Sequence, residues 1–286
     1  MCHNSHIVQR LLLSSILFLQ VINISGAMSI LSGKRVLVTG AGRGIGRAIA
    51  NICAGEGANV AICSRTKSEL EETMAELEAT QPSSNMGIYV VDLKDQEQVD
   101  SMVSSIVEKF GGIDILINNG GSNQAGKGPS YELATSDLRD LLDLNIASVH
   151  TVTSSVLKKT MLKNGSGRIV NISSKAGKIG IPNMSFYCAS KFALEGYSAS
   201  IAEELKDKNI IVNTISPGMV DTRSFPKAAD KKGVRTAESV RDGLLLLLTT
   251  DKTGHYVHVD ELDVVKEKGL DDEMALKPIN EAPFSV

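Results

Sequence analysis

The chain has 286 residues, of which 42% are hydrophobic and 22% are charged, and its formal net charge is −3. This is the composition of an ordinary globular protein that is long enough to bury one sizeable core. The slight negative charge and the lack of a dense basic stretch argue against nucleic acid as a partner. We therefore expect small molecules and further copies of the chain as its partners.

The four cysteines and five histidines show no metal-ligand spacing and no C-x-x-C motif. A secreted disulfide-rich protein or a structural zinc site would show regular cysteine spacing. We therefore expect reduced cysteines, no disulfide framework and no metal site. The cysteines are Cys2, Cys53, Cys63 and Cys188.

Residues 1–27 allow two interpretations. An apolar run at 11–24 follows basic residues and precedes small ones, as in a signal peptide or a short membrane anchor, which would place the protein in the endoplasmic reticulum or secretory pathway. Alternatively, Met28 is the natural start and the preceding residues are an over-long start. The unpaired cysteines and the potential glycosylation sequons at Asn171 and Asn183 favour a reducing compartment, so we expect a cytoplasmic protein.

From residue 34 onward, short β-branched runs alternate with longer amphipathic stretches. This alternation predicts a parallel sheet with helices on both faces, and the nearly continuous apolar strands fit a sheet that is buried on both sides. We expect one doubly wound α/β domain of the Rossmann type over residues 28–260, with about seven strands. In chain order, the predicted elements are a strand at 34–39, a helix to about 55, a strand at 59–63, a helix at 66–79, a strand at 87–91, a helix at 95–110, a strand at 114–118, a helix at 136–162, a strand at 168–173, a helix at 185–208, a strand at 210–216, a helix at 238–248 and a strand at 255–259.

The tail at residues 261–286 is charged, contains two prolines and shows no clear period. We expect it to be a C-terminal extension that is loose or packed by a partner.

A glycine-rich turn, Thr-Gly-Ala-Gly-Arg-Gly-Ile-Gly at residues 39–46, joins the first predicted strand to the first helix. Glycine allows the backbone to approach a pyrophosphate closely, and a helix N-terminus supplies free N–H groups and the positive end of its dipole. Ligands of open α/β sheets bind at the carboxyl ends of the strands, where this turn lies. The glycines at 40, 44 and 46 therefore predict a phosphate site. The alternative is that they only allow a tight turn between the strand and the helix.

Tyr187 and Lys191 are four residues apart in a predicted helix and therefore share one face. The phenol of tyrosine has an ordinary pKa of about 10, and a neighbouring ammonium should lower that pKa towards neutrality and make the phenol useful in acid–base catalysis. Any long helix offers such pairs, so the spacing alone does not decide the matter. A serine-hydrolase interpretation of Ser174 fails because the chain has no Gly-x-Ser-x-Gly elbow.

Five motifs occur in one fixed order and carry a family resemblance: the glycine turn, Asn118-Asn119-Gly120-Gly121, Ser174, Tyr187-x-x-x-Lys191 and Pro217-Gly218. Over about residues 34–260 the chain resembles the short-chain dehydrogenase/reductase family, in the compact branch that includes carbonyl reductases and 3-oxoacyl-carrier-protein reductases. The extended branch, with its sugar-nucleotide epimerases, is disfavoured because Arg43 stands where its spacing has glycine. Two departures from the family are Gly120, where alanine is usual, and the long tail.

The resemblance implies an NADP(H)-dependent oxidoreductase that transfers a hydride between the nicotinamide and a carbonyl or a secondary alcohol. It implies that Tyr187 is the general acid or base, that Lys191 also holds the nicotinamide ribose, and that Ser174 hydrogen-bonds the substrate oxygen, with Ser173 as the rival for that role. Asn145 would support a water-mediated proton relay. The resemblance also implies a homodimer or homotetramer formed through the two long helices. The alternative is a non-catalytic NADP-binding regulator or scaffold, which would be expected to lose such residues.

The choice of nicotinamide cofactor depends on the residues after the second predicted strand. No acidic residue follows that strand to accept the 2′-hydroxyl of NAD, whereas Ser64 and Arg65 can bind a 2′-phosphate. Arg43 resembles the basic residue that family members place on the other side of that phosphate. NADP(H) is therefore favoured over NAD(H). The alternative is that the two arginines are solvated surface residues. By resemblance, Asp92 would contact the adenine and Thr222 the carboxamide, and the cofactor cleft would further include Gly40, Gly44, Ile45, Gly46, Asn118, Gly120, Pro217, Gly218 and Val220.

Overall fold

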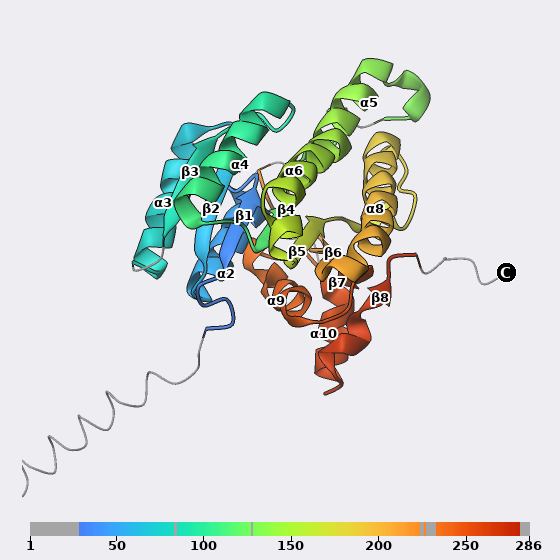
Figure 1. Ribbon diagram of the computed structural model, residues 1–286. Coiled ribbons are helices and arrows are strands. Elements are labelled where there is room, and N and C mark those ends of the chain that lie inside the picture. The colour runs from blue at the N-terminus through green and yellow to red at the C-terminus, as the bar shows by residue number, and fades with distance from the viewer. Residues whose placement is uncertain (1–28, 83–84, 127, 224–225, 227–232, 281–286) are drawn as a thin grey trace, which may run out of the picture.

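The computed structural model describes residues 29–82, 85–126, 128–223, 226 and 233–280. The possible leader at 1–27 lies outside these ranges, and so does the end of the tail at 281–286. The described chain forms three layers, in which helices cover both faces of a central sheet (Figure 1). The prediction of a doubly wound α/β domain is confirmed.

Within the described ranges, eight strands form one sheet in the order β3-β2-β1-β4-β5-β6-β7-β8. All neighbours from β3 to β7 are parallel, and β8 joins the edge of β7 in the antiparallel direction. The chain first builds the sheet outward from β1 to β3 and then returns to build it from β4 onward, which opens a crevice at the carboxyl ends of β1 and β4. The strands are β1 (Arg35–Thr39), β2 (Asn59–Ser64), β3 (Met86–Val90), β4 (Ile115–Asn118), β5 (Gly167–Ile172), β6 (Ile210–Ser216), β7 (His255–His258) and β8 (Lys277–Pro278).

The predicted long helix over residues 136–162 is interrupted twice by π-helical turns, at Asp143–Ala147 and Leu157–Met161. Such turns occur often at functional sites, and the first of them contains Asn145. The α-helices are α2 (Gly44–Gly55), α3 (Lys67–Thr80), α4 (Gln96–Phe110), α5 (Thr135–Leu142), α6 (Ser148–Val156), α7 (Leu162–Asn164), α8 (Ser185–Leu205), α9 (Arg241–Thr249) and α10 (Val259–Glu267).

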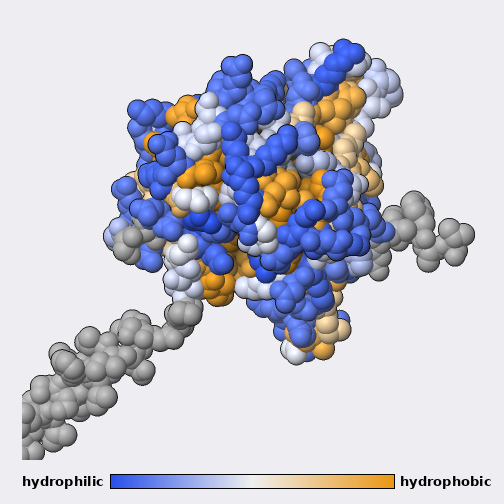
Figure 2. Space-filling view, viewed as in Figure 1, coloured by the Kyte–Doolittle hydropathy of each residue, from blue (hydrophilic) through white to orange (hydrophobic). Residues whose placement is uncertain are grey.

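The two faces of the sheet are covered by different helices, and the side chains of β1 alternate between them. Val36 and Val38 pack with residues of α2, α3, α9 and α10, whereas Leu37 packs with residues of α4, α6 and α8. Successive side chains of a strand point to opposite faces of the sheet, and helices cover both faces, so the side chains on both faces must be apolar. This explains the nearly continuous apolar strands in the sequence. The surface in Figure 2 is mostly hydrophilic, and its hydrophobic residues form several separate patches, one of them near the centre of the view.

The ends of α4 illustrate how local sequence sets a helix. The carboxylate of Asp95 accepts hydrogen bonds from the backbone N–H groups of Glu97 and Gln98, which would otherwise lack partners at the helix start. The helix ends at Gly111, whose φ of 80° lies in the left-handed region that glycine adopts readily. None of the helices within the described ranges is both long and apolar enough to cross a bilayer.

The tail departs from the prediction of a loose or partner-packed extension. The helix α10 continues through Glu267, and the side chain of His258 caps it by accepting a hydrogen bond from the N–H of Asp260. Leu262 and Leu276 are buried in the same core as α2 and α9. Only a few apolar residues of the tail pack against the domain, so the charged sequence shows no regular spacing of apolar residues that would predict a helix.

Replacing Leu262 with alanine tests the packing of the tail. Leu262 is fully buried, so Leu262→Ala should lower the free energy of unfolding by about 2–5 kcal/mol. Val264 lies two residues later on the same helix and is 46% exposed, so Val264→Ala should cost less than about 0.5 kcal/mol. Urea unfolding followed by circular dichroism measures both values. Equal, small effects of the two substitutions would show that the tail does not stabilise the domain.

Candidate active site

A cavity of about 740 Å³ opens at the carboxyl ends of the parallel strands. Its walls come from the glycine turn after β1, from the segments that follow β2, β3, β4, β5 and β6, and from the start of α8. Ligand pockets usually measure roughly 300–1,000 Å³, so this volume suits a nucleotide cofactor. Every predicted cofactor-binding residue lines the cavity except Asn118.

The glycine turn packs closely against the segment that follows β4. Gly40 has a φ of 64°, and a Cβ on it would lie 2.8 Å from the Cα of Gly120, so no larger residue fits there without displacing the backbone. The side-chain amide of Asn119 donates hydrogen bonds to the carbonyl oxygens of Thr39 and Gly40, at 3.0 and 3.1 Å. These bonds hold the turn at the edge of the cavity.

The N-terminus of α2 faces the cavity at this edge, where its first residues, Gly44, Ile45 and Gly46, contribute to the lining. Among the described residues, no side chain caps this helix start. The free N–H groups and the dipole of a helix start favour a phosphate. The glycine turn and α2 therefore fit the pyrophosphate of a dinucleotide.

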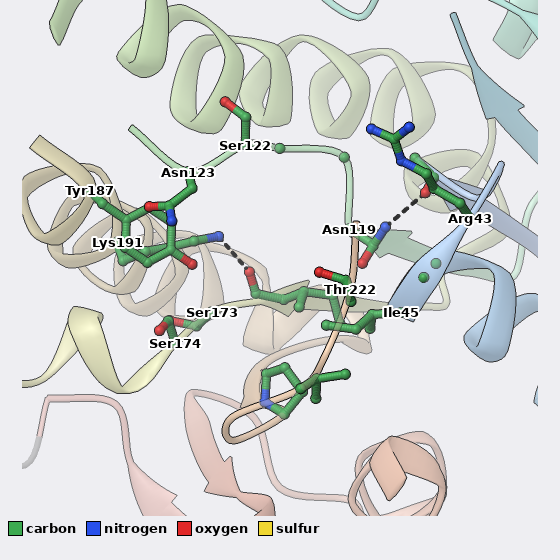
Figure 3. A pocket seen from close by; sticks show the side chains of 18 of the residues that line it. Arg43, Ile45, Asn119, Ser122, Asn123, Ser173, Ser174, Tyr187, Lys191 and Thr222 are labelled. Carbon is green, nitrogen blue, oxygen red and sulfur yellow. Dashed lines mark hydrogen bonds between the residues drawn. The ribbon is translucent and has the colours of Figure 1, made fainter. Parts of the chain in front are cut away.

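Three of the four predicted catalytic side chains, those of Ser174, Tyr187 and Lys191, gather at the opposite end of the cavity. Figure 3 shows Ser174, Tyr187 and Lys191 close together and Arg43 far from them, with Thr222 between the two groups. The ammonium of Lys191 donates a hydrogen bond of 2.8 Å to the carbonyl oxygen of Ile172 and lies 5.8 Å from the centre of the Tyr187 ring. The end of β5 thereby positions the lysine.

Ser174 and its rival Ser173 differ in exposure. Ser173 is buried, and its hydroxyl has no hydrogen-bond partner within the described residues. Ser174 is half-buried; its hydroxyl accepts a hydrogen bond of 3.1 Å from the backbone N–H of Ala176 and lies close enough to Tyr187 to lower the pKa of the phenol. The geometry therefore favours Ser174 as the residue that accompanies the phenol.

The expected lowering of the Tyr187 pKa by Lys191 is not found. Burial raises the pKa of the Tyr187 phenol above its ordinary value, and the hydrogen bond with Ser174 only partly offsets this effect. Burial also lowers the pKa of Lys191 to about 8, although the carboxylate of Glu195 opposes that shift. Attraction between opposite charges is only one contribution to a pKa, and here the cost of removing each group from water outweighs it.

Two predicted site residues do not line the cavity. Asn145 is buried, and its amide donates hydrogen bonds to the carbonyl oxygen of Ser122 and to the hydroxyl of Ser190, at 2.9 and 3.0 Å. It therefore braces the segment after β4 against α8. Asn118 is also buried, and its amide donates to neighbouring side chains in the interior. Asn119, the next residue in the chain, lines the cavity in its place.

The end of the cavity beside the glycine turn and the segment after β2, which we call the adenosine end because a dinucleotide would place its adenosine there, contains the predicted basic residues and an acid that was not predicted. Ser64, Arg65 and Asp92 line this end, and Arg65 is exposed. The guanidinium of Arg43 donates a hydrogen bond of 2.8 Å to the carboxylate of Glu69, in the first turn of α3. In the sequence, Glu69 belongs to a Lys/Glu-rich stretch typical of a solvated helix face, so nothing distinguished it.

Comparison with known proteins agrees with this geometry. The sequence model described as short chain dehydrogenase matches residues 34–233. A protein of Streptomyces coelicolor that is named as a ketoacyl reductase is 37% identical over 187 residues, covering 65% of this chain and 70% of its own length. The crystal structure of a variant actinorhodin polyketide ketoreductase with NADPH has 28% identity and a TM-score of 0.73, covering 80% of this chain and 97% of its own.

The crystal structure of NAD⁺-bound xylitol dehydrogenase is similar too, with 29% identity and a TM-score of 0.72, covering 80% of this chain and 98% of its own. The family model spans most of the described domain, and the two similar structures share its overall fold. The chain therefore belongs to the short-chain dehydrogenase family.

Proposed function

We propose that this short-chain dehydrogenase is an NADP(H)-dependent oxidoreductase that transfers a hydride between the nicotinamide and a carbonyl or secondary alcohol. The observation that carries the proposal is the grouping of Ser174, Tyr187 and Lys191 at one end of a cavity whose other end is a glycine turn and a helix start. The names of the ketoacyl reductase and the polyketide ketoreductase support a carbonyl substrate.

Each side chain has a role that follows from its position. A bound nicotinamide dinucleotide supplies or accepts the hydride. The phenol of Tyr187 donates its proton to the substrate oxygen during reduction and takes it back during oxidation. The hydroxyl of Ser174 hydrogen-bonds the same oxygen as negative charge develops there. Lys191 would hold the ribose hydroxyls of the bound cofactor, and its charge would stabilise the phenolate that remains after proton transfer.

Burial raises the pKa of the Tyr187 phenol, so the resting phenol keeps its proton and the positive charge of Lys191 has to stabilise the phenolate that forms when this proton is donated. Lys191, with a pKa of about 8, still carries its charge at neutral pH. Asn145 acts as a positioning residue, because it fixes Ser122 and Ser190 beside the cavity.

The preference for NADP(H) rests on this chain's own residues, since the similar structures contain either NADPH or NAD⁺. Ser64 and Arg65 line the adenosine end of the cavity, and Arg43 lies there as well. A guanidinium makes charge-assisted, often paired hydrogen bonds with phosphate oxygens. These three residues therefore favour a cofactor that carries a 2′-phosphate.

The central test of the catalytic role is Tyr187→Phe. The variant should lose at least about 100-fold in NADPH oxidation across a panel of ketones and 3-oxoacyl thioesters, because it cannot protonate the product oxygen. Its affinity for NADPH, measured by fluorescence titration, should change little. Tyr197→Phe is a matched control on the same helix, since Tyr197 contacts His150 and does not line the cavity. If both the wild type and Tyr187→Phe bind NADPH and neither oxidises it with any carbonyl, the protein is a non-catalytic NADP-binding regulator or scaffold and the proposed enzymatic function is wrong.

The test of cofactor preference is Arg65→Ala. Loss of a charged phosphate contact should weaken NADPH binding by roughly tenfold and leave NADH binding nearly unchanged. Lys67→Ala controls for the general loss of a nearby positive charge, because Lys67 is exposed on α3 and does not line the cavity. Equal losses for NADPH and NADH in Arg65→Ala would contradict the preference.

A further inference from the structure

An acidic side chain lies at the adenosine end of the cavity although no acid follows β2 in the sequence. Glu69 enters from the first turn of α3 and lines the cavity beside Ser64 and Arg65. A Cβ placed on Gly42 would lie 3.0 Å from the hydroxyl oxygen of Ser64 and 3.3 Å from Oε2 of Glu69. The hydroxyl and the carboxylate therefore flank the glycine turn at one point.

The Glu69 carboxylate already binds two of the positive charges in this corner. Its Oε1 accepts hydrogen bonds from Arg43 and Arg223, at 2.8 and 3.1 Å. Arg223 comes from the segment after β6, so one carboxylate oxygen links the glycine turn, α3 and that distant segment. The positive charge that Arg43 offers to a phosphate is thus partly compensated before any phosphate arrives.

Glu69 differs from the other acids on the same helix. Its side chain is 17% exposed, whereas that of Glu72 is 65% exposed. Glu72 pairs with Arg47, and neither of these residues lines the main cavity. Glu69 is therefore the acid of α3 that a bound cofactor would meet, and Glu72 is a solvated partner of the helix surface.

We propose that Glu69 is a specificity residue that reduces the preference for NADP(H) by competing with the 2′-phosphate for Arg43. This inference rests on the proposed function. A phosphate brought beside Glu69 meets a like charge and must share the guanidinium, whereas a 2′-hydroxyl can donate a hydrogen bond to the carboxylate. Arg43 and Arg65 favour the phosphate while Glu69 opposes it, so the wild type should bind both nicotinamides with a modest preference for NADPH.

The test measures dissociation constants of NADPH and NADH for the wild type, Glu69→Gln and Glu72→Gln by fluorescence titration, without substrate. The amide of Glu69→Gln keeps the shape of the side chain and removes its charge. It should tighten NADPH binding about three- to fivefold, the size expected for one partly exposed charge, and leave NADH binding unchanged or weaker. Glu72→Gln should leave both constants at the wild-type values.

An unchanged or reduced ratio of NADPH to NADH affinity in Glu69→Gln would overturn the inference, because Glu69 would then serve to orient Arg43 for the phosphate or have no part in binding. Arg65→Ala, measured alongside, separates the two proposals. If it loses NADPH selectively while Glu69→Gln changes nothing, only the role of Glu69 fails. If it loses both cofactors equally, the NADP(H) preference itself fails.

Discussion

Parallel pairing of β1 with β4 is the constraint on which the site depends. It brings the two strands' carboxyl ends together at the point where the sheet's winding reverses, and the turns that follow them must share one small space. The hydroxyl of Thr39 accepts hydrogen bonds from the N–H groups of Asn119 and Gly120, at 3.0 and 2.9 Å, and so locks the two turns together. The start of α2 consequently faces the cavity in a fixed position.

The catalytic end depends on a second junction, between β5 and α8. The carbonyl oxygen of Ile172, the last residue of β5, holds the ammonium of Lys191, which lies one helical turn from Tyr187. Burial disfavours a charge on either side chain alone. A phenolate beside an ammonium is nevertheless a compensated pair, and in the proposed mechanism proton donation by Tyr187 creates that pair. The arrangement therefore favours the charge distribution that follows proton transfer.

The sequence predicted the sheet and its parallel direction, and nearly all of the residues it singled out for the cofactor line the cavity, because these features follow from apolar runs, glycine spacing and an ordered set of motifs. It failed where a residue's role depends on contacts between distant segments. Asn118 and Asn119 are adjacent, and the pleat of β4 decided which of them faces the cavity. Glu69 resembles its neighbours on α3 until Arg223 approaches it from the segment after β6.

The tail and the phenol pKa were mispredicted for related reasons. The helix α10 packs through a few buried residues such as Leu262, which a charged stretch conceals in the sequence. The pKa of Tyr187 depends on how much water the folded chain excludes, and a spacing of four residues gives no information about that. Burial, rather than local pattern, was the missing quantity in both cases.

The most direct measurement of the central claim follows the hydride itself. NADPH labelled with deuterium at one or the other face of nicotinamide C4 is incubated with the enzyme and a ketone, and the alcohol is analysed by mass spectrometry. We expect deuterium on the carbinol carbon from one face only, because a fixed cavity presents a single face of the ring to the substrate. Alcohol that carries no deuterium from either label, or equal amounts from both, would contradict direct hydride transfer in this site.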